Sequence, residues 1–515
     1  MEKVDRFLDL ASGISAARVS RRSVLQGGGA LLLGLALGPL ARAGERGRPL
    51  RPPGSLPFPH LPEGTDTLPE IEHVIVLMME NHSYDNYLGT LRRGDGFRLR
   101  DGRPRDANPD GNGNLVHAFR MPSTCQLDGS PGQNWNASHV SFDGGRNDGF
   151  VRASGPVAMG YWTGDDLPFY AGLARTFPLA DRWFSSTLCQ TYPNRRFLLA
   201  GTAAGIVSTS GAALMAPPPP NGNIMERLDA HGISWRNYAS DLPGIAILLE
   251  YALAHSSNIS PIAQFFADAA SGALPFLSFV DPAFEGGGSE ENPDDIQVGE
   301  AFAASVIQAA MSGPAWPRTL LVWLYDEHGG YYDHVPPPRA VAPDDIPPDI
   351  MVPPDEPGGY DRYGFRVPAV IVSPYARREH VSHRVRDHTS ILKLVETKWN
   401  LPALTFRDAN ADDLLDCLDL RRPPAFLEPP ELPQPALTTS PSSCTPGNPG
   451  PLPPPDAVTP IGDDRHHRSF AGPWRRSQGA RGDYARADAG APSAFSRAGG
   501  RSVVIRRQGT SRSTA

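Results

Sequence analysis

Two pairs of polar residues each follow an apolar run that has the length of a buried strand. Glu80 and Asn81 follow "HVIVLMM", and Asp326 and Glu327 follow "TLLVWLY". An apolar environment does not hold adjacent carboxylates unless a cation compensates their charge. Carboxylate and amide oxygens are the ligands that hard divalent metal ions prefer. The pairs therefore predict a metal site. The alternative is that Asn81 caps the next helix and that the acids lie in solvent.

A candidate nucleophile lies between these pairs, in "SSTLCQTYPNRRFLLAGT", residues 185–202. Thr191 comes just before a predicted helix, whose free N–H groups and positive dipole favour a phosphate beside the hydroxyl. A hydroxyl bound to a metal loses its proton more easily and can attack phosphorus. The alternative is that Thr191 only caps the helix. Asn194, Arg195 and Arg196 follow, and an arginine there pairs either with phosphate or with a local carboxylate.

Four histidines are candidates for binding phosphate oxygens or for protonating a leaving group. They are His139, His328, His334 and His388. Each one taken alone is equally compatible with a structural or surface role.

The elements that must position these residues alternate between short apolar runs and amphipathic segments. The predicted strands are residues 73–79, 232–238, 275–280, 319–325 and 368–373, and the predicted helices include residues 224–232, 295–311 and 388–399. This alternation predicts an α/β fold with a mostly parallel central sheet and helices on both faces. Ligands of such sheets bind at the carboxyl ends of the strands, where both polar pairs fall. Residues 333–363, rich in Pro and Asp, predict a long surface loop.

The composition divides the 515 residues into four regions: 1–43, 44–66, 67–432 and 433–515. The first is interpreted as a signal peptide, the second as a Pro-rich linker, the third as a catalytic domain and the fourth as a disordered tail. The formal net charge of -8 argues against a nucleic-acid-binding protein. Four cysteines allow up to two disulfides, in three pairings.

The first region has the features of a twin-arginine signal peptide. "SRRSVLQ" precedes an apolar stretch over residues 30–40, and "ARA" follows at residues 41–43. The apolar stretch is too short to predict a retained membrane span. We therefore expect contact with the twin-arginine export machinery and a location in the periplasm, in the cell wall or outside the cell. The arginines of the tail outnumber its acids, so peripheral contact with the envelope is an alternative to a simple solvated tail.

Six blocks in order resemble a known family. They are "IEHVIVLMMENHSYDNYLG", "TYPNRRFLLAGT", "GISWRNY", "VWLYDEHGGYYDHVPPP", "GFRVPAVIVSPYA" and "DHTSILKLVE". Over residues 70–430 the chain resembles the bacterial phosphoesterase family of phosphatidylcholine-type phospholipases C and acid phosphatases, within the alkaline-phosphatase-like superfamily.

The resemblance implies specific roles for residues of this chain. It implies that Glu80, Asn81, Asp326 and Glu327 bind a metal ion, with Thr191 as a further ligand and as the nucleophile. It also implies that His139 lies on the phosphate side. The oxygen ligands favour Ca, Mg or Mn, whereas relatives in the superfamily often use Zn.

The chain departs from the family pattern at one position, where Asn292 precedes Pro293 and the family commonly has histidine. Asn292 and Arg195 are the two predicted substrate contacts. Asp281, Glu290 and Glu291 lie nearby without a predicted role.

Three functions are compatible with these residues. The first is an exported phospholipase C that acts on phospholipid or on a small phosphoester through a phosphothreonine intermediate. The second is a phosphomonoesterase with the same fold, because loops rather than motifs read the leaving group. The third is a non-catalytic surface protein. Trp135, Tyr161 and Trp162 are candidates for an aromatic cage around choline, or for core residues.

Overall fold

The computed structural model describes residues 49–125, 131–285, 287–437 and 453–461. The predicted signal peptide and most of the predicted tail lie outside the described residues. Among the helices of these ranges, none combines the length and the apolar character that a membrane span requires.

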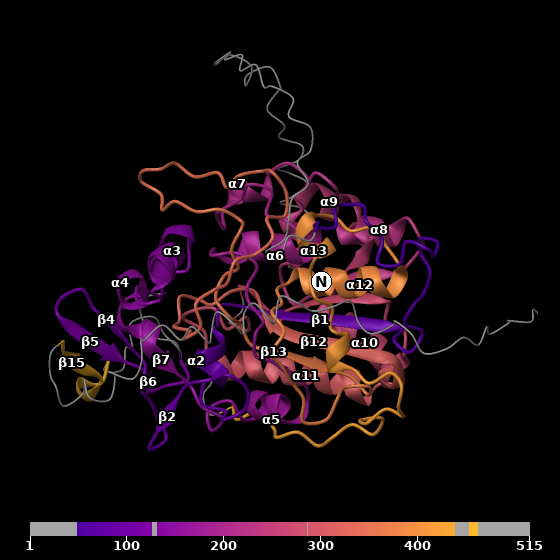
Figure 1. Ribbon diagram of the computed structural model, residues 1–515. Helices are drawn as coiled ribbons and strands as arrows, with labels where there is room; N and C mark the ends of the chain where they lie inside the picture. The colour runs from indigo at the N-terminus through magenta and orange to yellow at the C-terminus, as the bar shows by residue number, and fades with distance from the viewer. Residues whose placement is uncertain (1–48, 126–130, 286, 438–452, 462–515) are drawn as a thin grey trace, which may run out of the picture.

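A mixed sheet of eight strands forms the centre of the molecule (Figure 1). Its order is β10 (Ile259–Pro261), β9 (Trp235–Ala239), β11 (Leu277–Asp281), β1 (His73–Met79), β12 (Thr319–Tyr325), β13 (Ala369–Val372), β8 (Leu179–Ala180) and β14 (Val381–Ser382). All neighbours pair in parallel except β13, which is antiparallel to β12 and to β8. The five predicted strands are confirmed, and the short edge strands β10, β8 and β14 were not predicted.

Helices cover both faces of this sheet, as the alternating pattern predicts (Figure 1). The helices of the described residues are α2 (Tyr84–Leu88), α3 (Trp135–Phe142), α4 (Phe150–Ser154), α5 (Pro168–Thr176), α6 (Thr191–Ala200), α7 (Gly211–Leu214), α8 (Ile224–Asp229), α9 (Leu249–Ala254), α10 (Ile262–Ser271), α11 (Ile296–Ser312), α12 (Thr389–Trp399) and α13 (Phe406–Ala409); α3 and α4 lie beside the small strands instead. In the view shown, α6, α8 and α12 lie over one face, and α5, α10 and α11 over the other. The predicted α/β fold is confirmed.

The central strands β1 and β12 are apolar along most of their length because both of their faces are covered. Every residue of β12 is buried, and β1 is buried from Val74 onward. One large cluster of buried side chains draws on residues from Leu68 to Ala457.

A group of small strands lies to one side of the main sheet (Figure 1). They are β2 (Leu99–Arg100), β3 (Arg103–Pro104), β4 (Ala107–Pro109), β5 (Asn114–His117), β6 (Phe119–Arg120), β7 (Gly160–Tyr161) and β15 (Val458–Pro460). They form one three-stranded and two two-stranded sheets. Two- to four-residue strands are too short for an alternation of side chains to be recognised in the sequence.

The prediction of a disordered tail is wrong for residues 453–461. β15 pairs antiparallel with β5, with Val458 opposite Val116. β15 has three residues in a Pro-rich stretch and no apolar periodicity, so its sequence alone does not predict a strand. The strand is recognised by its pairing with β5.

The predicted linker packs against the domain. Gly54 N–H donates to the carbonyl of Ala403 at 2.7 Å, and Phe58 N–H donates to Asn400 Oδ1 at 2.9 Å. The predicted loop 333–363 contains no helix or strand, but its first residues are buried, Asp333 completely. Cys125 is disulfide-bonded, while Cys189 and Cys417 are free and buried.

Candidate functional site

The register of two neighbouring strands brings the polar pairs together. Met79, the last residue of β1, is paired with Tyr325, the last residue of β12. Glu80 and Asp326 therefore leave the sheet side by side, and the N–H of Asn81 donates to Asp326 Oδ1 at 3.2 Å. The prediction that these side chains lie at one edge of the sheet is confirmed.

The backbone turns sharply directly after both strands. Asn81 has a φ of 71°, a left-handed conformation that asparagine tolerates better than most residues. After β12, Gly329 has a φ of +64°, and a Cβ at this position would lie 1.8 Å from the carbonyl oxygen of Asn81. The glycine lets the two turns touch, and its N–H donates to Glu327 Oε2 at 2.8 Å.

The buried polar atoms at this edge are not all satisfied by the protein. Glu327 Oε1 and Asn81 Oδ1 are buried and have no hydrogen-bond partner. Burial, together with the charge of Asp326, raises the pKa of Glu80 and of Glu327 well above the usual range. Unpaired hard oxygens in an excess of negative charge fit a divalent cation, so the donor set is compatible with the predicted metal site.

Arg195 is the cation that compensates these acids in the structure. Its guanidinium lies 3.0 Å from Asp326, 3.6 Å from Glu80 and 3.7 Å from Asp281. Burial alone would lower the pKa of Arg195, but these carboxylates raise it. Of the two partners that the sequence leaves open, the local carboxylates are the ones the structure provides. Arg195 therefore compensates these acids, and its contact with a substrate stays a prediction.

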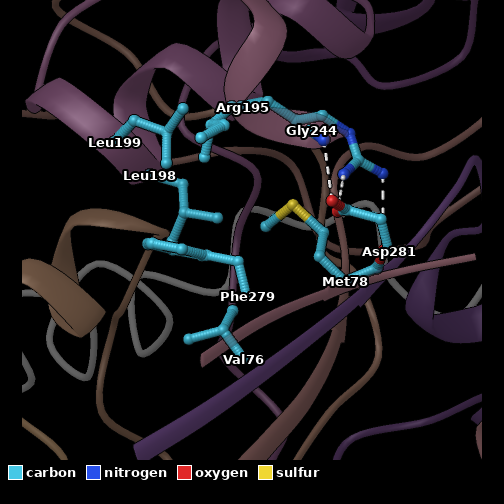
Figure 2. A pocket seen from close by; sticks show the side chains of 9 residues that line it. Val76, Met78, Arg195, Leu198, Leu199, Gly244, Phe279 and Asp281 are labelled. Atoms are coloured by element: carbon cyan, nitrogen blue, oxygen red, sulfur yellow. Dashed lines mark hydrogen bonds and ion pairs between the residues drawn. The ribbon is translucent and has the colours of Figure 1, made fainter. Parts of the chain in front are cut away.

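A small pocket lies beneath Arg195, between α6 and the sheet (Figure 2). Its apolar wall is made by Val76, Met78, Leu198, Leu199, Ile245 and Phe279. The guanidinium and Asp281 close one end, and the N–H of Gly244 donates to Asp281 Oδ2 at 2.7 Å (Figure 2). This apolar floor keeps water away from the ion pairs and so strengthens them.

Asp281 had no predicted role, yet it ends β11 as Glu80 follows β1. The signal was present in "PFLSFVD", an apolar run that closes on a carboxylate. What the sequence does not reveal is that β11 lies next to β1, which brings Asp281 to the same edge.

Thr191 is the first residue of α6, and Gln190 occupies the N-cap position without a side-chain cap. The alternative that Thr191 only caps the helix is therefore wrong. Asn194 holds the preceding loop: its Oδ1 accepts from the N–H of Thr187 at 3.0 Å, and its Nδ2 donates to the carbonyls of Cys189 at 2.8 Å and Gln190 at 3.1 Å. This completely buried amide positions the hydroxyl of Thr191 at the start of the helix.

Two of the predicted histidines lie at the strand-end site. His328 Nδ1 lies 2.9 Å from Glu327 Oε2, and burial lowers the pKa of His328 to about 3. His388 Nε2 donates to the carbonyl of Asp326 at 2.7 Å, while its Nδ1 accepts from Trp183 Nε1 at 3.3 Å. Both ring nitrogens of His388 have protein partners, so we interpret His388 as a residue that positions Asp326 rather than as an acid or base.

The other two histidines have partners elsewhere. His139 Nδ1 lies 2.8 Å from the carbonyl of Trp135, and its ring packs on the Trp135 ring with centroids 4.2 Å apart. His334 Nδ1 lies 2.6 Å from Asp85, and burial is outweighed by Asp85 and other acids, which raise the pKa of His334 to about 10. His334 is thus part of a buried ionic network with Arg366. The contacts of His139 give its predicted role on the phosphate side no support among the described residues.

The loop 289–292 lies against both strand ends. The N–H of Glu80 donates to the carbonyl of Ser289 at 3.1 Å, and Tyr331 Oη donates to Asn292 Oδ1 at 3.0 Å. Asn292 Nδ2 is buried and has no hydrogen-bond partner among the described residues; its contact with a substrate stays a prediction. The Glu290 carboxylate accepts hydrogen bonds from the hydroxyls of Tyr87, Tyr170 and Tyr325. Glu291 Oε1 accepts a hydrogen bond from Gln133 Nε2.

The predicted aromatic cage for choline does not form. Trp162 is buried, and its Nε1 donates to the carbonyl of Ser123 at 2.9 Å. Tyr161 packs against Phe97, and Trp135 against His139. The three side chains are core residues with separate neighbours.

Known proteins are similar to this chain over about two thirds of its length. The family model described as the phosphoesterase family matches residues 71–402. Phospholipase C B of Mycobacterium tuberculosis is 31% identical over 423 residues, which cover 69% of this chain and 79% of that protein. Non-specific phospholipase C1 of Arabidopsis thaliana is 29% identical over 407 residues, 72% of this chain and 75% of that protein. Hemolytic phospholipase C of Pseudomonas aeruginosa is 27% identical over 401 residues, which cover 54% of its length.

Solved structures are similar at a lower level. A phosphonate monoester hydrolase of Agrobacterium radiobacter is 10% identical with a TM-score of 0.34, covering 67% of this chain and 77% of that one. A protein in the alkaline phosphatase superfamily from Vibrio parahaemolyticus is 10% identical with a TM-score of 0.30, covering 63% and 76%.

Proposed function

This chain belongs to the phosphoesterase family and is a hydrolase of phosphoric ester bonds, and from this premise we propose that it is an exported, metal-dependent phospholipase C. The substrate would be a phospholipid, cleaved to diacylglycerol and a phosphorylated head group. The similarity to proteins that are named phospholipases C supports this type of cleavage. Metal dependence, the nucleophile and export are our proposals.

One observation carries the assignment of the nucleophile. Arg195 lies four residues after Thr191 on α6, and its guanidinium pairs with both Asp326 and Glu80. Because four residues are about one helical turn, the first turn of α6 is tied to the strand-end acids. A hydroxyl nucleophile and the oxygen donors of a metal site thus belong to one assembly.

A divalent ion held by Glu80, Asn81, Asp326, Glu327 and Thr191 would supply a Lewis acid that lowers the pKa of the threonine hydroxyl and offsets phosphate charge. The remaining features of the chemistry come from the protein. The N-terminal N–H groups of α6 favour the anionic phosphate beside Thr191. Arg195 and the apolar pocket below it hold Asp326 and Glu80 in place.

The proposed reaction has two steps. Thr191 Oγ attacks phosphorus, the Oγ–P bond forms, and the bond between phosphorus and the diacylglycerol oxygen breaks, with that oxygen taking up a proton. Water then attacks the phosphothreonine, the Oγ–P bond breaks, and Thr191 regains its proton as the phosphorylated head group leaves. In both steps the fixed positive end of α6 lies where negative charge gathers on the phosphoryl oxygens.

Export is proposed from the arginine pair Arg21 and Arg22, followed by an apolar stretch and "ARA". Fractionation of cells that produce the full chain tests this part. Changing both arginines to lysine should retain the protein in the cytoplasm with an uncleaved N-terminus. Unchanged export of that variant would remove the twin-arginine route from the proposal.

Hydrolysis of p-nitrophenyl phosphorylcholine, with and without a chelator, tests the enzymatic part. We expect turnover that the chelator abolishes, and acid quenching should trap the phosphorylcholine group on Thr191. Thr191→Ala should lower kcat by at least about a thousandfold and retain part of the metal binding, measured by calorimetry. Thr176→Ala is the matched control, because that hydroxyl donates only to Gly172 within α5.

Near-normal turnover by Thr191→Ala would show that the assigned nucleophile is wrong. Faster hydrolysis of p-nitrophenyl phosphate than of the phosphorylcholine ester would make the protein a phosphomonoesterase instead.

A further inference from the structure

Two large apolar side chains are exposed at the tip of the loop that connects β12 to β13. Met351 is 69% exposed and Val352 is 57% exposed, more than any other large apolar residue that the structure describes. The loop stands out from the domain near α3 and α7 (Figure 1). A single exposed apolar residue is common, so the significance of this adjacent pair depends on how the loop holds it.

Hydrogen bonds hold the tip in one turn. The N–H of Met351 donates to Asp355 Oδ2 at 2.8 Å, and the N–H of Asp355 donates to the carbonyl of Met351 at 2.7 Å. Asp355 Oδ1 also accepts from Asn136 Nδ2 of α3 at 3.0 Å. Pro353 and Pro354 restrict the backbone between these bonds. Because the turn is already ordered, burying its side chains against a partner would cost little conformational entropy.

The base of the tip packs on the segment that carries the candidate nucleophile. Ile350 contacts a small buried cluster that includes Cys189 and Phe197. Cys189 lies two residues before Thr191, and Phe197 is on α6. The tip therefore has a fixed position relative to the start of α6, and a surface bound by the tip would be held beside that part of the molecule.

The loop around the tip is acidic. Residues 340–360 contain five acids and no Lys, Arg or His. Asp349 and Glu356, one on each side of the tip, are exposed. Elements that bind anionic lipid carry basic residues beside their apolar side chains, so an anionic membrane would repel this loop. A zwitterionic lipid surface has no net charge, and its outward quaternary ammonium groups would attract the carboxylates.

We propose that Met351 and Val352 form a docking point for a zwitterionic phospholipid surface. The two side chains would enter the boundary between head groups and acyl chains, and Asp349 and Glu356 would face the ammonium groups. This inference rests on the proposed function and deepens it, because it names the surface on which a phospholipid substrate would be met.

Sedimentation with sucrose-loaded vesicles tests the docking, in the presence of a chelator so that no lipid is hydrolysed. The wild-type full chain should bind phosphatidylcholine vesicles more tightly than phosphatidylglycerol vesicles. Met351→Ser combined with Val352→Ser should weaken binding to phosphatidylcholine at least about tenfold, because the transfer of two apolar side chains from water is lost. Asp349→Asn combined with Glu356→Gln should narrow the preference for phosphatidylcholine.

Leu427→Ser is the matched control, because Leu427 is 50% exposed and the change also removes a large apolar side chain from the surface. Its neighbour Phe426 packs on Phe177 at the end of α5, on the other face of the sheet from α6. This variant should bind vesicles as the wild type does. With metal present, all variants should hydrolyse soluble p-nitrophenyl phosphorylcholine at the wild-type rate, whereas hydrolysis of phosphatidylcholine vesicles should fall only when Met351 and Val352 are changed.

Unchanged vesicle binding by the Met351→Ser and Val352→Ser double variant would overturn the proposal. An equal loss in Leu427→Ser, or tighter binding of the wild type to phosphatidylglycerol, would also overturn it. A wild-type dimer that the double variant dissociates, without any vesicle binding, would assign the tip to a second copy of this chain instead. Failure of the proposed function is distinguishable, because the wild type would then not hydrolyse p-nitrophenyl phosphorylcholine, whereas vesicle binding requires no turnover.

Discussion

Replacing Arg195 with methionine should destabilise the metal-free protein and make it more dependent on a divalent cation. Methionine can fill the apolar floor of the site but leaves Asp326, Glu80 and Asp281 without their guanidinium. The side chain of Arg195 is 5% exposed and that of Asp326 is 0% exposed, so water cannot take over the compensation.

The size of the effect follows from this burial. Removing one partner of a buried ion pair typically costs about 3–5 kcal/mol, because an uncompensated charge remains. A ligand that binds only the folded state returns about 2.7 kcal/mol at a hundred times its Kd. Since the metal and Arg195 neutralise the same carboxylates, the metal should return at least about 1 kcal/mol more to the variant than to the wild type.

Urea unfolding with chelator and with saturating metal measures both quantities. Arg196→Met is the matched control: Arg196 is equally buried, but its Nη2 donates to the carbonyl of Pro217 and no acid pairs with it among the described residues. The free energy of unfolding of Arg196→Met should change much less, and its gain from metal should equal that of the wild type.

A loss in Arg195→Met no larger than that in Arg196→Met would refute charge compensation. If stability were unchanged and KM for phosphoesters rose instead, Arg195 would be the substrate contact that the sequence first suggested.

Two further changes test how Asn194 positions Thr191 and how Glu290 affects the pH dependence of stability. Asn194→Ala removes the hydrogen bonds that hold the loop before Thr191. We expect kcat to fall at least about tenfold with little change in KM, and the free energy of unfolding to fall by about 1–3 kcal/mol. An unchanged kcat would contradict the positioning role of Asn194. Glu290 accepts hydrogen bonds from Tyr87 at 2.8 Å and Tyr170 at 2.6 Å, and burial raises its pKa to about 8. A raised pKa in the folded state means that stability is lost as pH rises from about 4.5 through 8, so Glu290→Gln should make this decline shallower by about 1.4 kcal/mol per pH unit between pH 6 and 8, measured by urea unfolding. An equally steep decline in that variant would exclude Glu290 as its source.

Local signals in the sequence were sufficient for the strands that carry the site. The bounds of β1 and β12 agree with the predicted runs because both faces of these strands are covered and all of their residues after His73 and Thr319 are apolar or aromatic. The polar pairs directly after them were equally visible, since a charged residue ends such a run abruptly. The helix after the Ser-Thr-rich loop was predicted too, but it was expected just after Thr191, whereas α6 includes Thr191 as its first residue.

The partners of these side chains could not be predicted in the same way. Whether Arg195 binds phosphate or carboxylate depends on β12, β1 and β11 lying side by side, which brings Asp326, Glu80 and Asp281 to one edge. The sequence makes His388 a candidate acid, but its two ring nitrogens bind Trp183 and the carbonyl of Asp326. Distances between elements far apart in the chain decide these roles, and no local pattern encodes them.

The site is built so that one helix and two strands depend on each other. The register of β1 and β12 brings Glu80 and Asp326 together, but the negative charges of two neighbouring buried carboxylates repel each other. Arg195 removes this conflict, and because it is on α6 it also fixes the helix whose first residue is Thr191. The ion pairs that stabilise the acidic edge thus also hold the first turn of α6 against it, so under the proposed function a bound metal ion would not require the fold to reorganise. Weakening Arg195 should consequently impair folding and catalysis together, whereas Asn194 should affect mainly catalysis.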